Sequence, residues 1–136
     1  MKPDPKAEAG RWLKQAEHAL SVARKLLTDS YFSDCCFNAE QAGQLALKAF
    51  LYSQGERFVT IRSVKELAER CAAYDAAFKR VEDAGRVLDH YYIPTRYPDA
   101  LAFPALPYES YTEREAKEAV EFASMMIELV QQTLSR

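Results

Sequence analysis

The sequence is poor in the residues that build metal, redox and phosphate-loop sites. Its 136 residues include only three cysteines, two histidines and four glycines. No CxxC pair occurs, and two histidines are too few for a Cys/His zinc site of the usual spacing. There is no glycine-rich phosphate loop, no Walker motif and no carboxylate cluster at metal-ligand spacing. The sequence therefore predicts neither a bound metal ion nor a cofactor.

Long apolar runs and an excess of positive charge are absent as well. No run approaches the roughly 20 apolar residues of a membrane span, and residues 1–5 lack the apolar stretch of a signal peptide. The 18 basic and 20 acidic residues give a formal net charge of −2. This balance argues against a protein that coats duplex DNA through bulk positive charge, although a local basic patch is compatible with it. We expect a cytoplasmic protein that does not enter a membrane.

The cysteines point to a reducing compartment. Cys35, Cys36 and Cys71 are odd in number, and two of them are adjacent on a predicted helix. Side chains of neighbouring helical residues diverge by about 100°, so this pair is poorly placed to form a disulfide. We expect all three to be small buried thiols.

The composition that remains predicts helix over nearly the whole chain, because Ala, Leu, Glu, Lys, Arg and Gln fill the stretches between few turn signals. The second of these helices is apolar on most sides and keeps a narrow polar stripe of Gln41, Gln44 and Lys48, which is typical of the middle of a bundle. Residues 63–66 and 112–115 match the capping box that begins a helix. The expected helices span residues 5–28, 33–54, 63–72 and 75–90, with a fifth beginning at 112. We predict one all-α domain over residues 1–136, an up-and-down bundle of four main helices plus a short one.

One stretch does not fit a bundle of short connections. Residues 91–111, called here the Pro/Tyr-rich segment, hold four of the six prolines and five of the eight tyrosines. Loops longer than about 12–15 residues in compact domains are usually functional or disordered. Prolines favour an extended path, and the aromatic side chains need surface to pack on. We therefore expect an ordered strap laid across the bundle before the last helix.

Residues 88–99 read LDHYYIPTRYPD. This run closely resembles the LD-x-YYIPTRYPD signature of prokaryotic HEPN-domain proteins, and residues 12–20, 36–49 and 111–119 resemble other parts of that family in the same order. The resemblance covers about residues 9–130. It implies a helical bundle that commonly forms a homodimer and is often encoded beside a small nucleotidyltransferase, as a toxin–antitoxin-like pair. It also implies one of two activities, namely nucleotide binding or metal-independent RNA cleavage through an Arg-x(4–6)-His motif.

The chain departs from the nuclease motif. Counted from Arg96, the histidine should stand at one of three positions that hold Leu101, Ala102 and Phe103. None of these side chains can exchange a proton near neutral pH, as acid–base cleavage of RNA requires. His90, which directly precedes the Pro/Tyr-rich segment, is the candidate for a displaced catalytic histidine.

Four other positions bear on the nuclease motif. Arg11 and His18 match its spacing, but they lie on the first predicted helix, where the family does not carry it. Relatives often have histidine where this chain has Arg62 and glutamate where it has Gln44. Each departure removes a titratable group and weakens an acid–base interpretation.

The residues favour three functional hypotheses. The first is a homodimeric module that binds nucleotide or RNA phosphate and acts with a nucleotidyltransferase, because arginine offers a fork for phosphate and tyrosine a stacking face. The second is an RNA endonuclease toxin in which Arg96 and His90 converge in a dimer cleft. The third is a purely structural or regulatory subunit whose partner does all the chemistry. A structural role of the same residues is also open, in which Tyr91 and Tyr92 anchor the segment and Arg96 pairs with Asp89 or Asp99. The predicted ligand-binding residues are Tyr91, Tyr92, Thr95, Arg96 and Tyr97.

Overall fold

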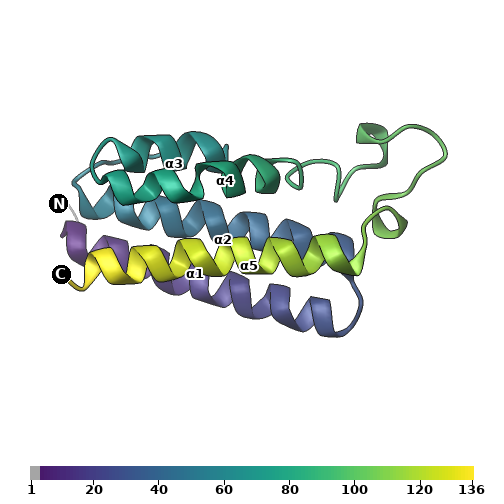
Figure 1. The fold of residues 1–136 in the computed structure, drawn as a ribbon, viewed down its shortest axis with the longest axis horizontal. Helices are drawn as coiled ribbons and strands as arrows, with labels where there is room; N and C mark the ends of the chain where they lie inside the picture. The colour runs from purple at the N-terminus through teal and green to yellow at the C-terminus, as the bar shows by residue number, and fades with distance from the viewer. Residues whose placement is uncertain (1–3) are drawn as a thin grey trace.

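The protein is described from a computed structural model that covers residues 4–136; residues 1–3, part of the proline-containing start of the chain, lie outside this range. Within it there are helices and turns but no strand, as the composition predicts. Figure 1 shows the long helices packed side by side. The elements in chain order are α1 (Pro5–Thr28), α2 (Phe32–Ser53), α3 (Val64–Ala72), the 3₁₀ helix η1 (Ala76–Val81), α4 (Glu82–Asp89), the 3₁₀ turns η2 (Pro98–Ala100) and η3 (Pro107–Glu109), and α5 (Glu113–Leu134).

Helix α2 lies at the centre of the bundle, as its nearly continuous apolar surface predicts. It contacts α1, α3, α4 and α5. Its small residues let these neighbours approach closely. Five of them, spaced three or four residues apart, are fully buried: Cys35, Ala39, Ala42, Ala46 and Ala49. The expectation of buried thiols is confirmed, since all three cysteines are buried and burial raises the pKa of each thiol.

The up-and-down order holds for α1 with α2 and for α3 with α4, but the connection between the two pairs differs. Gly55, at φ +92°, reverses the chain after α2. The Val59 N–H then donates to the Tyr52 hydroxyl at 3.1 Å, which holds the returning chain against α2. Helix α3 therefore runs parallel to α2. Its first residue, Val64, lies beside Gly43 of α2, and near its end the Cys71 thiol donates to the Leu47 carbonyl.

The single helix expected over residues 75–90 is divided in two. Its first part, η1, is a 3₁₀ helix, and only its second part, α4, is α-helical. In a 3₁₀ helix the side chains at i and i+3 eclipse one another. This geometry buries both Phe78 and Val81, and the Phe78 ring packs 4.4 Å from that of Phe50.

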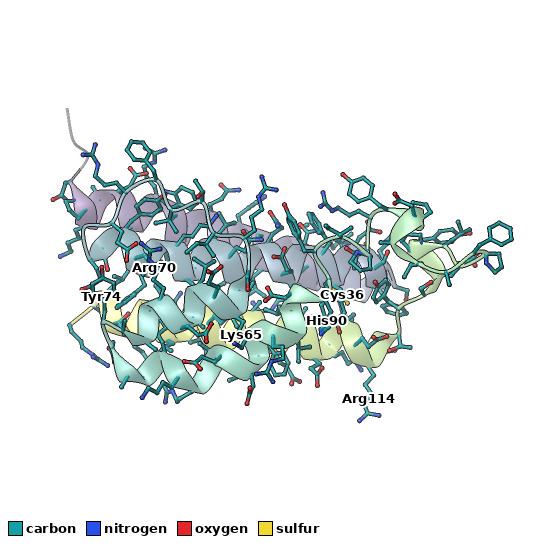
Figure 2. All side chains as sticks on the ribbon, turned by 90° about the horizontal axis from the view of Figure 1, so that it is seen from above. Cys36, Lys65, Arg70, Tyr74, His90 and Arg114 are labelled. Carbon is teal, nitrogen blue, oxygen red and sulfur yellow. The ribbon has the colours of Figure 1, made fainter. Side chains whose placement is uncertain are left out.

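The Pro/Tyr-rich segment connects α4 to α5, but it does not lie across the bundle as expected. Figures 1 and 2 both show it extending beyond the end of the helices. Its two ends are held by buried Tyr91, Thr95 and Pro107, whereas between residues 96 and 106 only Leu101 is even partly covered. The Phe103 side chain is 98% exposed. Tyr91, Tyr92, Tyr97 and Tyr111 pack at the base of the segment, whereas the tip with Phe103 is left in solvent.

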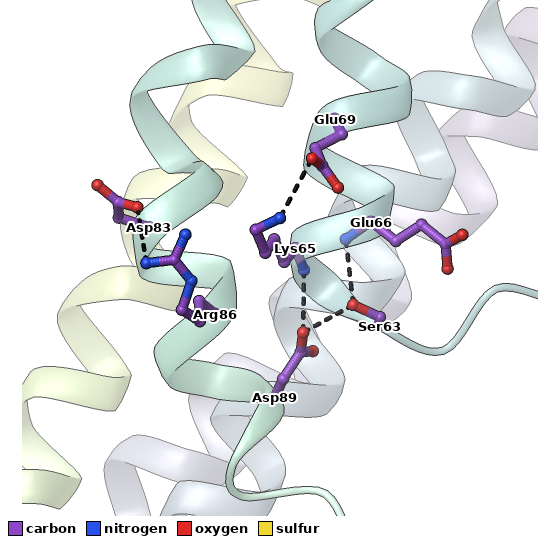
Figure 3. Close-up of polar contacts among 7 residues, drawn as sticks. All are labelled: Ser63, Lys65, Glu66, Glu69, Asp83, Arg86 and Asp89. Atoms are coloured by element: carbon purple, nitrogen blue, oxygen red, sulfur yellow. Dashed lines mark hydrogen bonds and ion pairs between the residues drawn. The ribbon is translucent and has the colours of Figure 1, made fainter.

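The start of α3 is capped by a residue from another helix. The Ser63 hydroxyl accepts from the Glu66 N–H as predicted, but the reciprocal half of the capping box is not formed there. Instead the Asp89 carboxylate accepts from the Val64 N–H at 2.6 Å. It also accepts from the Lys65 N–H at 3.3 Å and from the Ser63 hydroxyl at 2.7 Å (Figure 3). A carboxylate at a helix N-terminus satisfies backbone donors and interacts favourably with the helix dipole. The end of α4 is therefore fixed to the start of α3.

Gly85 makes this contact sterically feasible. A Cβ atom at this position would lie 2.8 Å from the Lys65 backbone nitrogen and 2.9 Å from its Cα atom. Because these atoms belong to the backbone, the clash cannot be relieved by turning a side chain. The absence of a side chain thus allows α4 to approach α3 closely enough for Asp89 to reach its N–H groups.

We expect Gly85→Ala to lower the free energy of unfolding by about 1–3 kcal/mol, the usual cost of overpacking. Gly10→Ala is the matched control, because nothing lies within 4 Å of a Cβ atom there. That substitution should raise the free energy of unfolding by about 0.5–1 kcal/mol through helix propensity. Urea unfolding of both variants measures the difference, and equal effects would contradict the close approach of α4 and α3.

Candidate functional site

Arg96 lies among three aromatic rings at the base of the Pro/Tyr-rich segment. Its guanidinium carbon is 4.4 Å from the ring centroid of Phe37, 5.0 Å from that of Tyr92 and 4.9 Å from that of Tyr97. The rings of Phe37 and Tyr92 lie 6.5 Å apart in a stacked arrangement. Such cation–π contacts orient an arginine without using its N–H groups. We call Arg96 with these three rings the arginine cage.

Most of the hydrogen-bonding capacity of Arg96 is unused. Its Nε donates to the Tyr92 carbonyl at 3.0 Å. The terminal guanidinium nitrogens make no hydrogen bond and no ion pair within residues 4–136, and the side chain is exposed. The predicted pairing of Arg96 with Asp89 or Asp99 is not formed. The Asp89 oxygens are occupied by the start of α3, and the one side-chain hydrogen bond of Arg96 within residues 4–136 goes to the Tyr92 carbonyl and not to Asp99.

The five predicted ligand-binding residues fall into two groups. Tyr92 and Tyr97 join Arg96 in the arginine cage. Tyr91 and Thr95 are buried beneath the segment, where the Thr95 hydroxyl donates to the Tyr91 carbonyl at 2.6 Å. The Tyr91 ring also packs edge-on against Tyr111, with centroids 5.8 Å apart. This second group holds the segment in place so that Arg96 faces solvent.

The histidines are exposed and are not joined to the arginine cage. His90 is the C-terminal cap of α4, and its side chain makes no hydrogen bond within the described part of the chain. Figure 2 shows it at the end of the helix pair from which the Pro/Tyr-rich segment departs. His18 lies exposed on α1. A catalytic role of His90 stays a prediction.

Glu40 is the residue near this site that the sequence analysis missed. It lies in α2 one turn after Phe37 and is fully buried. Gln41 Nε2 donates to one of its carboxyl oxygens at 2.7 Å, and Gln44 Nε2 donates to the other. Position 44 holds glutamine where relatives often have glutamate. A carboxyl group is nevertheless present one turn earlier, at Glu40, and it accepts a hydrogen bond from Gln44.

Burial controls the ionisation of Glu40. Desolvation raises the pKa of its carboxyl to about 7, against the opposing effect of the two glutamine hydrogen bonds. The charge of Asp89 also raises this pKa, and the charge of Arg96 lowers it. Glu40 thus lies within electrostatic reach of the arginine cage and changes its protonation state near neutral pH.

The polar stripe on α2 continues from Glu40 toward two further cations. Lys48 is partly buried with its ammonium 6.0 Å from the Trp12 ring centroid. Desolvation lowers the pKa of Lys48, the charge of Glu40 raises it, and the nearby Arg62 lowers it. Neither Lys48 nor the exposed Arg62 forms an ion pair among residues 4–136. Three cations without ion-pair partners therefore accompany one buried carboxyl on this face.

Two sequence signals could have identified the missed residues. Phe37 precedes Gln41, Gln44 and Lys48 at spacings of four, three and four, which places its aromatic ring on the same polar stripe. Glu40 stands between Ala39 and Gln41 in a helix that is otherwise apolar, where a carboxyl group needs hydrogen-bond partners. Neither signal shows that the segment around Arg96 packs against this face of α2.

Other kinds of site are not evident in the described residues. No group of three or more His, Cys, Asp or Glu side chains in residues 4–136 could hold a metal ion. None of the helices described is both long and apolar enough to cross a membrane. A cavity of about 400 Å³ lies between the start of α1 and the end of α2, but no predicted site residue lines it.

Comparison with known proteins agrees with the residues that carry the resemblance. Residues 9–133 match the HEPN domain family. The chain is 31% identical to ST0689, an archaeal HEPN homologue of known structure, over 98% of this chain and 99% of that one, with a TM-score of 0.76.

Two curated proteins are also similar. The protein named "Putative toxin MJ1304" from Methanocaldococcus jannaschii is 26% identical over 90% of this chain and 86% of its own length. Human sacsin is 30% identical over 124 residues, which is 88% of this chain. The chain spans only 3% of the length of sacsin.

We expect ionisation of Glu40 to cost the fold stability. The pKa in the folded protein is about 7 against an ordinary value of 4.5. Below about pH 4.5 the carboxyl is protonated in both the folded and the unfolded protein and costs no folding stability. As the pH rises from about 4.5 to 7, the unfolded protein ionises first, so the free energy of unfolding falls. A shift of this size corresponds to about 3 kcal/mol.

Glu40→Gln removes the titrating group, so its stability relative to wild type should rise by up to about 3 kcal/mol between pH 4.5 and pH 8. Urea unfolding at several pH values measures this difference. The exposed Glu118→Gln serves as the control and should show a flat difference. A flat difference for Glu40→Gln as well would contradict the raised pKa.

Proposed function

The chain belongs to the HEPN domain family, and from this premise we propose that it is a homodimeric binding module for nucleotide or RNA phosphate. In this proposal it acts with a nucleotidyltransferase partner as a toxin–antitoxin-like pair. The bound phosphate contacts the guanidinium of Arg96, and a base or ribose packs on the rings of the arginine cage.

The single observation that carries the proposal is the state of Arg96. Its terminal nitrogens are exposed and bond to nothing within the described residues, while three aromatic rings and one carbonyl hold the group in position. A guanidinium held in this way loses little conformational freedom when it binds a phosphate through two parallel N–H bonds. Tyr92 and Tyr97 add ring faces on which a base can stack.

The local charge supports the same ligand class. The whole chain is slightly acidic, yet Arg96, Lys48 and Arg62 carry positive charge without ion-pair partners in residues 4–136. Because none of the three cations is in direct contact with a carboxylate among the described residues, their N–H groups are available to a polyanion. The local basic patch that the net charge leaves open is therefore supplied by these three residues.

The partner proposal rests on similarity and on the shape of the Pro/Tyr-rich segment. A relative similar over most of its length is named a toxin, and the family resemblance implies pairing with a nucleotidyltransferase. The exposed tip carries Phe103, Leu106 and Tyr108, which are 98%, 40% and 69% exposed. Projecting aromatic side chains of this kind are common at protein–protein contacts.

We expect Arg96→Ala to weaken binding of AMP and of a short single-stranded oligoribonucleotide by about tenfold or more, the usual value of a charge-assisted phosphate contact. Arg114→Ala is the matched control, because it removes the same charge from an exposed position at the start of α5 (Figure 2). Calorimetric titration of the three proteins compares the affinities. Equal affinities would instead support the hypothesis of a purely structural or regulatory subunit.

An RNA endonuclease is the second candidate, favoured by the similarity to a protein named a toxin. Its weakness is chemical, since Leu101, Ala102 and Phe103 occupy the expected histidine positions and His90 is not bonded to Arg96. We expect the purified protein to cleave no RNA in the absence of added metal. Cleavage by wild type that is lost in both Arg96→Ala and His90→Ala would overturn this expectation and identify His90 as the displaced base.

A further inference from the structure

The buried carboxyl of Glu40 has no role in the binding contacts described so far. It cannot touch a ligand, because its side chain is fully buried. It is nevertheless next to the site, since Phe37, one turn before it on α2, forms one wall of the arginine cage. Both carboxyl oxygens are bonded only to amide groups of α2, those of Gln41 and Gln44. Among residues 4–136, no cation neutralises this carboxyl by direct contact.

The charged groups around Glu40 come from few elements. Asp89 acts on it from the end of α4, and Arg96 acts on it from the Pro/Tyr-rich segment. Within α2, Lys48 responds to its charge. Helices α1, α3 and α5 contribute no charged group that acts on Glu40 in residues 4–136; Glu115 and Glu118 of α5 act on Tyr91 instead. Asp89 is itself held by the start of α3, so Arg96 and Lys48 are the neighbouring charges of opposite sign.

We propose that Glu40 is the titratable counter-charge of Arg96, so that binding of a phosphate-class anion at this site is coupled to partial protonation of the Glu40 carboxyl. This inference rests on the proposed function, because it assumes that the anion binds at Arg96. It adds that the affinity of the site for an anion depends on whether Glu40 is protonated. Glu40 is a positioning residue in this scheme, since it acts on the ligand only through the field at Arg96.

The sign of the coupling follows from electrostatics. When Glu40 is ionised, its negative charge offsets part of the positive charge of Arg96 and repels an arriving anion. When Glu40 is protonated, Arg96 presents its full charge. By linkage, an anion bound at Arg96 favours the protonated carboxyl, so binding takes up a fraction of a proton and weakens as the pH rises through about 7.

The two glutamines can serve both protonation states. Each now donates an N–H to a carboxylate oxygen. An amide can also present its carbonyl oxygen after a half-turn, which gives a protonated carboxyl an acceptor. A buried cation in place of Gln44 would hold Glu40 permanently ionised. The amide pair instead keeps the carboxyl buried and leaves its proton exchangeable.

Sulfate is the first probe, because its charge is constant between about pH 6 and pH 8 whereas inorganic phosphate itself titrates there. A dinucleoside monophosphate, with one constant negative charge, is the second. Carbon-detected NMR follows the Glu40 carboxyl in wild-type protein with and without saturating sulfate. We expect the pKa of Glu40 to rise by about half a unit or more when sulfate binds. Both probes should bind about threefold more weakly at about pH 8 than at about pH 6.

Variants separate this inference from the proposed function. Glu40→Gln should bind both probes with the same affinity at the two pH values, whereas the exposed control Glu118→Gln should keep the wild-type pH dependence. Arg96→Ala should lose binding at both. If Glu40→Gln does not fold, the NMR titration of wild-type protein decides alone.

Two results would overturn the inference in distinguishable ways. Arg96-dependent binding with a pH-independent affinity and an unchanged Glu40 pKa rejects the proton coupling but leaves the proposed function intact. No binding of either probe, or equal binding by Arg96→Ala, rejects the proposed function and the coupling with it.

Discussion

The contact between Asp89 and the start of α3 is the constraint on which the arrangement of the site depends. A single carboxylate satisfies two backbone N–H groups and a hydroxyl of another helix, and Gly85 permits the close approach that this needs. Because Asp89 is also the last residue of α4, the Pro/Tyr-rich segment leaves the bundle from a fixed point. Arg96 follows seven residues later and meets Phe37 of the central helix. The placement of the arginine is thus a consequence of a helix cap.

Stability and binding make opposite demands on the central helix. The interior of α2 is packed with alanine, leucine and cysteine, yet it also contains a fully buried glutamate that is uncharged only below about pH 7. An apolar residue at this position would avoid the desolvation cost. The carboxyl group of Glu40 also lies within electrostatic reach of Arg96 in the arginine cage. Ionisable groups whose pKa values are shifted by burial are more frequent at functional sites than elsewhere in proteins.

Local rules in the sequence determine much of the fold and little of the site. The first, second and last helices could be predicted closely because residue composition, the polar stripe of the second helix and the capping box at residues 112–115 act within a few residues. The completion of the α3 cap by Asp89 could not, since its donor and acceptor lie about 25 residues apart in the chain.

The Pro/Tyr-rich segment shows the same limit. Its anchoring by Tyr91 could be anticipated from residue type, but no local rule states in which direction a proline-rich connection leaves a bundle. Arg96 was identified from the signature alone, whereas its neighbours Phe37 and Glu40 required the tertiary fold.

The separation of the segment into a buried base and a solvent-exposed tip has an evolutionary consequence. Residues 98–106 are exposed except for the partly covered Leu101, so substitutions, insertions and deletions there should change the core energetics little. Lineages that carry this fold are therefore free to change what the tip recognises while the cap, the core and the arginine stay constant.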